Sequence, residues 1–421
     1  MEVIDLNPEV GAVDRRWETE PDTYWAAIDA ATTGLDAPVF AADLAALRFN
    51  TGSMLRRAAG KPIRIASKSL RCRGMLDALL AIDGFAGVLA YDVAEAHWLA
   101  TDTDARPGCP DVLVAYPSAD LGALAALAAD EDAVSRVTLM VDDPAQLDLV
   151  DAAVPPSRRP DLRVCIDIDA SFQAPALGHL GVRRSPVRTR AEASVLAMTI
   201  GGRKGFRLVG VMTYDAQIAG VGDRGMRAPG GSALVRAMQG ASWDELVTRR
   251  REILTDLRRI APLEFVNGGG TGSLERNAED PNITDIAAGS GLYGPTLFDA
   301  YSHFMPAPAT GFGLAATRRP APDVITCHGG GWIASGPAGS DRVPRPVWPS
   351  GLKLLAREGA GEVQTPLRGE GAARIPLGDR VWFRHAKAGE PCEHTERIVV
   401  VADGGVVDEL PTYRGEGKVF L

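Results

Sequence analysis

Residues 62–70 carry a lysine in a position suited to covalent chemistry. Ile63, Ile65 and Ala66 form an apolar run, which predicts a short buried strand. Lys68 follows where that strand should end. If the strand belongs to a parallel α/β barrel, Lys68 lies on the catalytic face, at the carboxyl ends of the strands. An amine enclosed there can form a Schiff base with a carbonyl compound, whereas most lysines that follow strands are solvated loop residues.

Two glycine-rich segments could bind an anion. Residues 266–272 read Val-Asn-Gly-Gly-Gly-Thr-Gly, and residues 288–293 read Ala-Gly-Ser-Gly-Leu-Tyr. Glycine lets backbone N–H groups converge on one anion, and Thr271 and Ser290 add hydroxyl donors. In parallel barrels the loops after the last two strands are the favoured phosphate site. The two segments therefore predict a phosphate-bearing ligand, with tight turns between packed loops as the alternative.

A third group of reactive side chains lies near the carboxyl end of the chain. His385, Lys387, Cys392 and His394 fall in one short segment. His385 could act as a general base while the Lys387 ammonium polarises a substrate hydroxyl group. A metal site formed by His385 with Cys392 or His394 is the competing interpretation, and a hydrogen-bonded histidine at a domain interface is a third. We expect the neighbouring Glu390 to be solvated.

Strand-like and helix-like segments alternate through most of the chain, and this alternation would position the reactive side chains. Eight apolar runs are separated by helical stretches: residues 62–67, 87–91, 111–116, 137–141, 162–168, 208–214, 263–266 and 284–288. Such alternation indicates parallel strands with right-handed crossovers, and eight units of this kind close into a (β/α)8 TIM barrel. An open doubly wound sheet is the alternative. In a barrel, polar residues at the strand ends, such as Tyr116 and Tyr214, would converge on one rim.

The chain divides into three parts. Residues 1–36 are expected to form a polar N-terminal arm, and residues 37–305 the barrel domain. From residue 306 proline and glycine become frequent between short β-like runs, which predicts a separate, mostly β domain over residues 306–421. Two insertions, residues 170–190 and 216–240, follow strands and should lie over the catalytic face, as lids or as surface loops.

The composition is typical of a soluble globular protein, with 46% hydrophobic and 24% charged residues. The net charge of −9 and the lack of a basic run argue against nucleic acid as a partner. Without an apolar run long enough to cross a bilayer, and with an acidic N-terminus, the sequence predicts a cytoplasmic protein with no membrane partner. The five scattered cysteines, without a CxxC pair, predict free thiols.

Taken in this order, the segments resemble the fold-type III pyridoxal phosphate enzymes. Within them, the chain is most similar to the D-threonine aldolase and D-serine dehydratase group of the alanine racemase superfamily. The resemblance extends from about residue 37 to the C-terminus and rests on residues 64–68, 179–182, 208–214, 267–272 and 283–290. It implies an alanine racemase-type barrel followed by a β domain, a homodimer, and a small amino-acid substrate.

The resemblance also implies roles for individual residues. Lys68 would be the Schiff-base residue. His179 stands where the family has the arginine that meets the cofactor's phenolic oxygen, and Arg183 or Arg184 could supply the missing cation. The positions implied for binding the cofactor are Lys68, His179, Arg183, Tyr214, Asn267, Gly269, Gly270, Thr271, Gly289, Ser290 and Gly291.

This chain departs most clearly from the family's pattern at the metal site. In the family, a histidine ligand is followed two residues later by a second ligand; here the histidine is His385 and the second position holds Lys387. A protonated lysine has no lone pair for a metal ion, so a divalent manganese, zinc or magnesium ion would need Cys392 or His394 beside His385. We expect instead that the Lys387 ammonium stands in place of the metal ion.

The activity implied by the resemblance is that of a pyridoxal phosphate-dependent lyase acting on a 3-hydroxy amino acid of D configuration. Cleavage as in a D-threonine aldolase is the first expectation, and deamination as in a D-serine dehydratase is the second. A non-catalytic pyridoxal phosphate-binding protein is the alternative from another class.

Overall fold

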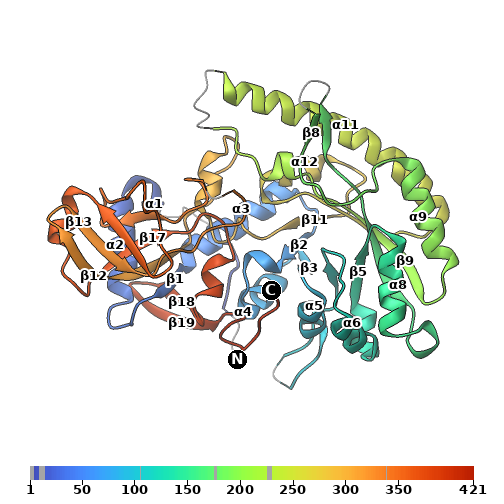
Figure 1. Cartoon of the computed structure of the whole chain (residues 1–421), viewed down its shortest axis with the longest axis horizontal. Helices are drawn as coiled ribbons and strands as arrows, with labels where there is room; N and C mark the ends of the chain where they lie inside the picture. Colours follow the sequence, from blue (N-terminus) through green and yellow to red (C-terminus); the bar gives the residue numbers. More distant parts are fainter. Residues whose placement is uncertain (1–3, 9–14, 105, 175–177, 225–229, 338) are drawn as a thin grey trace.

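Eight parallel strands form a closed barrel in the computed structural model, which describes residues 4–8, 15–104, 106–174, 178–224, 230–337 and 339–421 (Figure 1). Around the barrel the strands follow the order β10-β11-β2-β3-β4-β5-β6-β9. Their bounds are Ile63–Ala66 for β2, Phe85–Ala90 for β3, Val112–Val114 for β4, Val137–Val141 for β5, Leu162–Asp167 for β6, Phe206–Thr213 for β9, Phe265–Gly268 for β10 and Asp285–Ala288 for β11. All eight predicted strands are present, which confirms the barrel and rules out the open sheet.

The barrel strands are apolar along their whole length because both of their faces are covered. β5 is buried at every residue, as expected for a parallel strand between a packed interior and a layer of helices. A small apolar cluster fills the interior: Leu113, Met140, Cys165, Val209, Met212 and Phe265. Gly210 makes room for one member of this cluster, since a Cβ atom there would lie 2.2 Å from the Phe265 ring.

Helices connect the barrel strands, and aspartates at the strand ends begin several of them. The Asp92 side chain accepts hydrogen bonds from the first turn of α5, and Asp143 caps α8 in the same way. The helices are α3 Leu44–Ala58, α4 Arg73–Leu80, α5 Val93–Ala100, α6 Leu121–Ala128, α7 Glu131–Arg136, α8 Pro144–Ala153, α9 Arg190–Gly202, α10 Ala216–Ala219, α11 Gly231–Ile260 and α12 Leu274–Glu279. Within the residues that the structure describes, no helix is both long and apolar enough to cross a bilayer.

The second part of the molecule is a nine-stranded sheet of order β15-β16-β13-β12-β1-β18-β19, in which β17 pairs with β12 and β14 with β17. Its strands are β1 Val39–Asp43, β12 Thr310–Ala321, β13 Val324–His328, β14 Arg345–Trp348, β15 Lys353–Leu354, β16 Gln364–Arg368, β17 Arg380–Arg384, β18 Arg397–Ala402 and β19 Gly405–Pro411. Most pairs are antiparallel, and this confirms the predicted mostly β domain.

The N-terminal segment belongs to this sheet and not to the barrel. β1 lies between β12 and β18, so the barrel begins at β2 and not at residue 37. Helix α2, Pro21–Ala31, packs on the same sheet, where its Asp29 accepts hydrogen bonds from the Arg380 and Trp382 side chains. Figure 1 shows these blue elements among the orange and red strands. The apolar sequence of a strand does not show which sheet the strand will join. The predicted start of the barrel domain at residue 37 is therefore wrong, because the strand that begins there belongs to the second sheet.

Candidate active site

A cavity of about 410 Å³ lies at the carboxyl ends of the barrel strands. Its barrel side is formed by residues that follow β2, β3, β4, β9, β10 and β11, including Lys68, Tyr116 and Tyr214. The C-terminal domain contributes the rest of the lining described here, through Ser335, Arg342, Lys387, Ala388, Glu390 and Leu421. Side chains far apart in the sequence therefore share one enclosed space, as predicted for the rim of a barrel.

Lys68 lies in a short 3-10 turn, Ser67–Ser69, directly after β2. Its Nζ atom is 2.9 Å from the Tyr116 hydroxyl oxygen. Groups from later in the chain hold the end of this turn: the Tyr293 hydroxyl and the Cys392 thiol both donate to the Leu70 carbonyl oxygen, at 3.0 and 3.1 Å. The chain that follows the barrel thus fixes the loop that presents the lysine amine.

The two glycine-rich turns lie side by side and are joined by Thr271. Its Oγ1 atom accepts hydrogen bonds from the Gly291 amide and the Ser290 hydroxyl, both at 3.2 Å. A Cβ atom at Gly289 would lie 2.7 Å from the Ala66 carbonyl oxygen, and one at Gly270 would lie 2.9 Å from Ala219. A side chain at either point would force a shift, because both turns pack directly against neighbouring segments of the chain, as the alternative of tight turns between packed loops expects.

Arg184 places a guanidinium group in the cavity, in addition to the amine of Lys68. Its guanidinium lies over the Tyr116 and Tyr214 rings, 5.0 and 4.6 Å from their centroids, and donates to the Tyr116 hydroxyl at 3.3 Å. Burial raises the pKa of Tyr116, but the charges of Lys68 and Arg184 together outweigh it and hold the pKa below its usual value. Of the two arginines that the sequence offered, Arg184 lines the cavity and Arg183 does not, so the predicted site residue Arg183 is replaced by Arg184.

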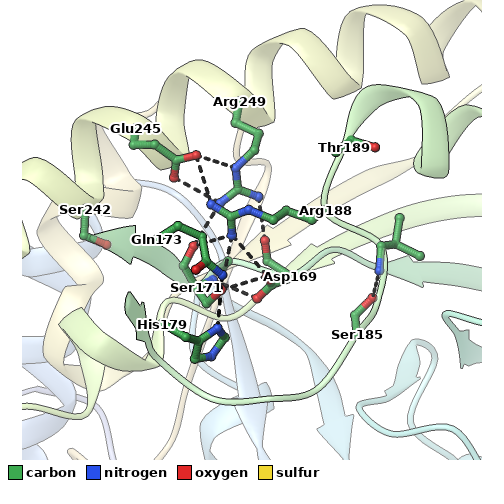
Figure 2. A network of polar contacts seen from close by, with 12 residues as sticks. Asp169, Ser171, Gln173, His179, Ser185, Arg188, Thr189, Ser242, Glu245 and Arg249 are labelled. Atoms are coloured by element: carbon green, nitrogen blue, oxygen red, sulfur yellow. Dashed lines mark hydrogen bonds and ion pairs between the residues drawn. The ribbon is translucent and has the colours of Figure 1, made fainter. Parts of the chain in front are cut away.

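His179 is the second predicted cofactor residue that lies outside the cavity lining. It sits on β8, Gly178–Leu180, which forms a hairpin with β7, Phe172–Ala174, and its Nδ1 atom is 3.2 Å from Gln173 Nε2. Figure 2 shows this pair at the edge of a polar network that also contains Asp169, Ser171, Arg188, Glu245 and Arg249. The hairpin directs His179 toward the network.

Residues 175–177 and 225–229 of the two predicted insertions lie outside the described part of the chain.

His385 is fully buried and does not line the cavity. Its ring packs edge-on against Phe40 and Tyr293, with centroids 6.3 and 6.4 Å away, and neither ring nitrogen has a hydrogen-bond partner in the described structure. Burial, with a contribution from Arg384, lowers the pKa of His385 to about 3. A histidine enclosed in this way cannot accept a proton from a substrate in the cavity, so we withdraw it as the general base.

The predicted metal ligands around His385 are used in other ways. The Cys392 thiol is committed to the Leu70 carbonyl, and the His394 ring stacks on Trp332 with centroids 4.8 Å apart. Over the residues that are described, no three histidine, cysteine, aspartate or glutamate side chains gather as a metal site would require. The five cysteines are free thiols, as predicted.

Lys387 and Glu390 place two ionisable groups in the C-terminal wall of the cavity. The Lys387 ammonium donates to the Ser335 hydroxyl at 3.0 Å, and burial lowers the pKa of Lys387, with further lowering by the charges of Lys68 and Arg342. Glu390 is not solvated as expected: its Oε2 atom is buried without a hydrogen-bond partner among the described groups, and burial raises its pKa to about 7. A carboxyl group of this kind can exchange a proton near neutral pH.

Of the other predicted residues, Lys68, Tyr214, Asn267, Gly269, Gly270, Thr271, Gly289 and Ser290 line the cavity, and Gly291 adjoins it through Thr271. Sequence reasoning missed Ser335, Arg342 and Glu390. The first two lie in a segment rich in glycine and proline without strand or helix periodicity, and no sequence signal marks them. For Glu390, its closeness in sequence to Lys387 was the one available hint.

No family model and no curated protein matches this sequence. Solved structures do match it along most of its length. A D-threonine aldolase from Filomicrobium marinum is 20% identical with a TM-score of 0.72, covering 90% of this chain and 95% of that one. A D-threo-3-hydroxyaspartate dehydratase from Delftia sp. HT23 is 19% identical with a TM-score of 0.67, covering 90% and 98%. An alanine racemase from Corynebacterium glutamicum is 15% identical with a TM-score of 0.54, covering 83% and 90%.

Proposed function

We infer that this chain, which has the fold of the fold-type III pyridoxal phosphate enzymes, is a pyridoxal phosphate-dependent lyase acting on a 3-hydroxy amino acid. The observation that carries the inference is the presence of an accessible lysine amine and a two-turn glycine cradle in one cavity. The named aldolase and dehydratase among the similar structures favour a substrate with a hydroxyl group on the β-carbon.

The residues of the cavity fit this cofactor. The Gly269–Thr271 and Gly289–Gly291 turns would hold its phosphate, Lys68 would hold its aldehyde carbon, and Arg184 offers a cation beside Tyr214 where the ring would lie. When bound, pyridoxal phosphate acts as an electron sink for negative charge that develops at the substrate α-carbon. It is the chain's own groups that must then handle the β-hydroxyl.

Two groups in the C-terminal wall are suited to that task. The Lys387 ammonium, held by Ser335, would polarise the hydroxyl oxygen and stabilise charge that develops on it. The Glu390 carboxylate would accept the hydroxyl proton as the Cα–Cβ bond breaks, since it lines the same cavity and has an unpartnered oxygen. Glu390 thus takes the role first predicted for His385, and the reaction is a D-threonine aldolase-like cleavage.

A dehydratase is the second candidate, favoured by the lowered pKa of Lys387. Burial lowers that pKa, which makes the ammonium a better proton donor to a departing hydroxyl group. Loss of water from the substrate, and then hydrolysis of the released imine to a keto acid and ammonia, would follow, as in a D-serine dehydratase. The homodimer and the cytoplasmic location expected from the sequence remain predictions.

Product analysis separates the two reactions. The holoprotein would be incubated with D-threonine and with D-serine. Aldol cleavage of D-threonine gives acetaldehyde and glycine, whereas deamination of D-serine gives pyruvate and ammonia. We expect the first pair to predominate. Yellow protein that turns over neither of these substrates nor any other 3-hydroxy amino acid would favour a non-catalytic binding protein, and protein that never takes up the cofactor would contradict the proposal altogether.

Gly289→Ala should weaken retention of the cofactor without unfolding the chain. The new methyl group would lie 2.7 Å from the Ala66 carbonyl oxygen, so either the turn or the end of β2 has to shift, and this would disturb the turn proposed to hold the phosphate. A shift that removes one charge-assisted hydrogen bond should raise the dissociation constant by about tenfold or more. Equilibrium dialysis against pyridoxal phosphate measures this. Gly240→Ala is the matched control: Gly240 lies within α11, outside the cavity lining, with nothing within 4 Å of the added atom, so this variant should retain the cofactor.

A further inference from the structure

Tyr116 is a titratable side chain of the cavity lining that the proposed reaction does not use. It follows β4 and is partly buried, and its hydroxyl oxygen lies 2.9 Å from the Lys68 Nζ atom. A second cation reaches the same oxygen from the loop after β8, where an N–H group of Arg184 donates to it at 3.3 Å. The phenol oxygen therefore accepts hydrogen bonds from two cationic groups.

This arrangement suits a phenolate better than a neutral phenol. A neutral phenol has one hydrogen of its own to donate, but an ammonium and a guanidinium have no lone pair to accept it. Among the described residues, the hydrogen-bond contacts of the Tyr116 oxygen are those with the Lys68 and Arg184 nitrogen atoms. Loss of the phenol proton removes the conflict and places one negative charge between two positive ones.

The charges around Tyr116 act in the same direction. Although burial raises the pKa of Tyr116, the charges of Lys68 and Arg184 outweigh it and hold that pKa below its usual value. Lys387, from the C-terminal domain, also interacts with the charge of this phenol, and so does Tyr214, which follows β9.

Tyr116 differs in this respect from the other tyrosines. The chain has seven, and burial raises the pKa of the remaining six: Tyr24, Tyr91, Tyr214, Tyr293, Tyr301 and Tyr413. Tyr116 is therefore the tyrosine expected to lose its proton first as the pH rises.

We propose that Tyr116 is the proton carrier of Lys68: its phenolate takes a proton from the Lys68 ammonium and returns it when the amine bonds to the cofactor aldehyde. This inference rests on the proposed function and deepens it. It adds a catalytic residue that touches the reacting nitrogen atom.

The protons balance in this step. An ammonium has three N–H bonds and no free electron pair, so Lys68 has to lose one proton before its nitrogen can attack the aldehyde carbon. Tyr116 takes this proton, and the freed electron pair forms the nitrogen–carbon bond. The aldehyde oxygen then leaves as water, with the proton that Tyr116 returns and a second one from the nitrogen, which keeps the third. Tyr116 is a phenolate again at the end.

The first test follows the ionisation of tyrosine in the cofactor-free chain through the ultraviolet absorbance of phenolate. Wild-type protein should show an early step, equal to one tyrosine, at a lower pH than the others. Tyr116→Phe should lack this step. Arg184→Gln should move it to higher pH, because removal of a neighbouring cation makes the phenolate less stable. Wild-type protein without an early step, or a step that persists in Tyr116→Phe, would overturn the inference.

The second test measures how fast pyridoxal phosphate is linked to Lys68, from the change in its absorbance after rapid mixing. Tyr116→Phe should slow both the formation and the reversal of the link by about a hundred- to ten-thousandfold, the usual contribution of acid–base catalysis. The equilibrium affinity should change by less than about tenfold, the value of one hydrogen bond, because a proton carrier accelerates both directions alike. Faster release with linking at the wild-type rate would show that Tyr116 only holds the cofactor, and would overturn the inference.

Tyr24→Phe is the matched control. Tyr24 lies on α2, outside the cavity lining, and its hydroxyl donates to the Pro308 carbonyl at 3.1 Å. This variant should keep the early step and both rates, and thermal unfolding reports whether each variant is folded. A chain that never links pyridoxal phosphate would overturn the proposed function and this inference with it. Linking at wild-type rates in Tyr116→Phe would overturn this inference alone.

Discussion

Replacing Lys68 by alanine should abolish covalent binding of the cofactor and lower turnover of any 3-hydroxy amino acid by on the order of a thousandfold or more. Lys68 is the lysine that the short turn after β2 presents to the cavity from the barrel side, next to the Tyr116 hydroxyl. Without its amine the cofactor would be held only by non-covalent contacts, such as those proposed for the glycine turns and Arg184, and it should leave on dialysis. Visible absorbance after dialysis and steady-state rates measure the two effects.

The control for Lys68→Ala is Lys204→Ala. Lys204 is exposed in the turn before β9 and does not line the cavity. It should keep both the absorbance and the activity. A folded Lys68→Ala protein that retained a dialysis-resistant yellow colour and wild-type rates would show that another amine carries the cofactor.

Glu390→Gln should lower the rate of cleavage by about a hundred- to ten-thousandfold, the usual contribution of a general base. A base must be deprotonated to act, and burial raises the pKa of Glu390 to about 7. In the wild-type protein kcat/KM should therefore rise with pH through about pH 7 and level off above it. Glutamine cannot titrate, so this limb of the profile should vanish in the variant.

Two further variants serve as comparisons for Glu390→Gln: the conservative replacement Glu390→Asp, and the control Glu396→Gln outside the cavity. Aspartate keeps a carboxyl group at the position and should preserve the limb at a reduced rate. Glu396 is exposed and lies outside the cavity, so its replacement should change neither rate nor profile. If Glu390→Gln kept full activity and an unchanged limb, the proton would have to go to another group, and the role given to Glu390 would be wrong.

The parts of the site that sequence could predict depend on short-range patterns. Lys68 follows an apolar strand. The runs of glycine show from the sequence alone that these two turns have no room for side chains at several positions. Strand and helix alternation predicted the barrel because each crossover is local and its handedness is constrained. From these features alone, Lys68 and the two glycine-rich turns can be assigned to the same end of the barrel, without information on contacts between distant segments.

The remaining parts depend on contacts between distant segments. His385 looked reactive by its sequence neighbours, but it is enclosed by Phe40 and Tyr293, which come from β1 and from the chain after the barrel. Arg183 and Arg184 are adjacent in an irregular segment, where no periodicity indicates which one points inward. The presence of Arg342 in the cavity lining likewise depends on how the loop that carries it packs against the barrel.

Reduction of the holoprotein with borohydride followed by peptide mapping tests the central claim most directly. The reagent makes the link between the cofactor and its amine permanent, so that the modified peptide can be isolated and sequenced. The cavity geometry predicts one modified lysine per chain, Lys68, in the peptide that contains residues 64–70. Modification of any other lysine, or none at all in yellow protein, would contradict the account.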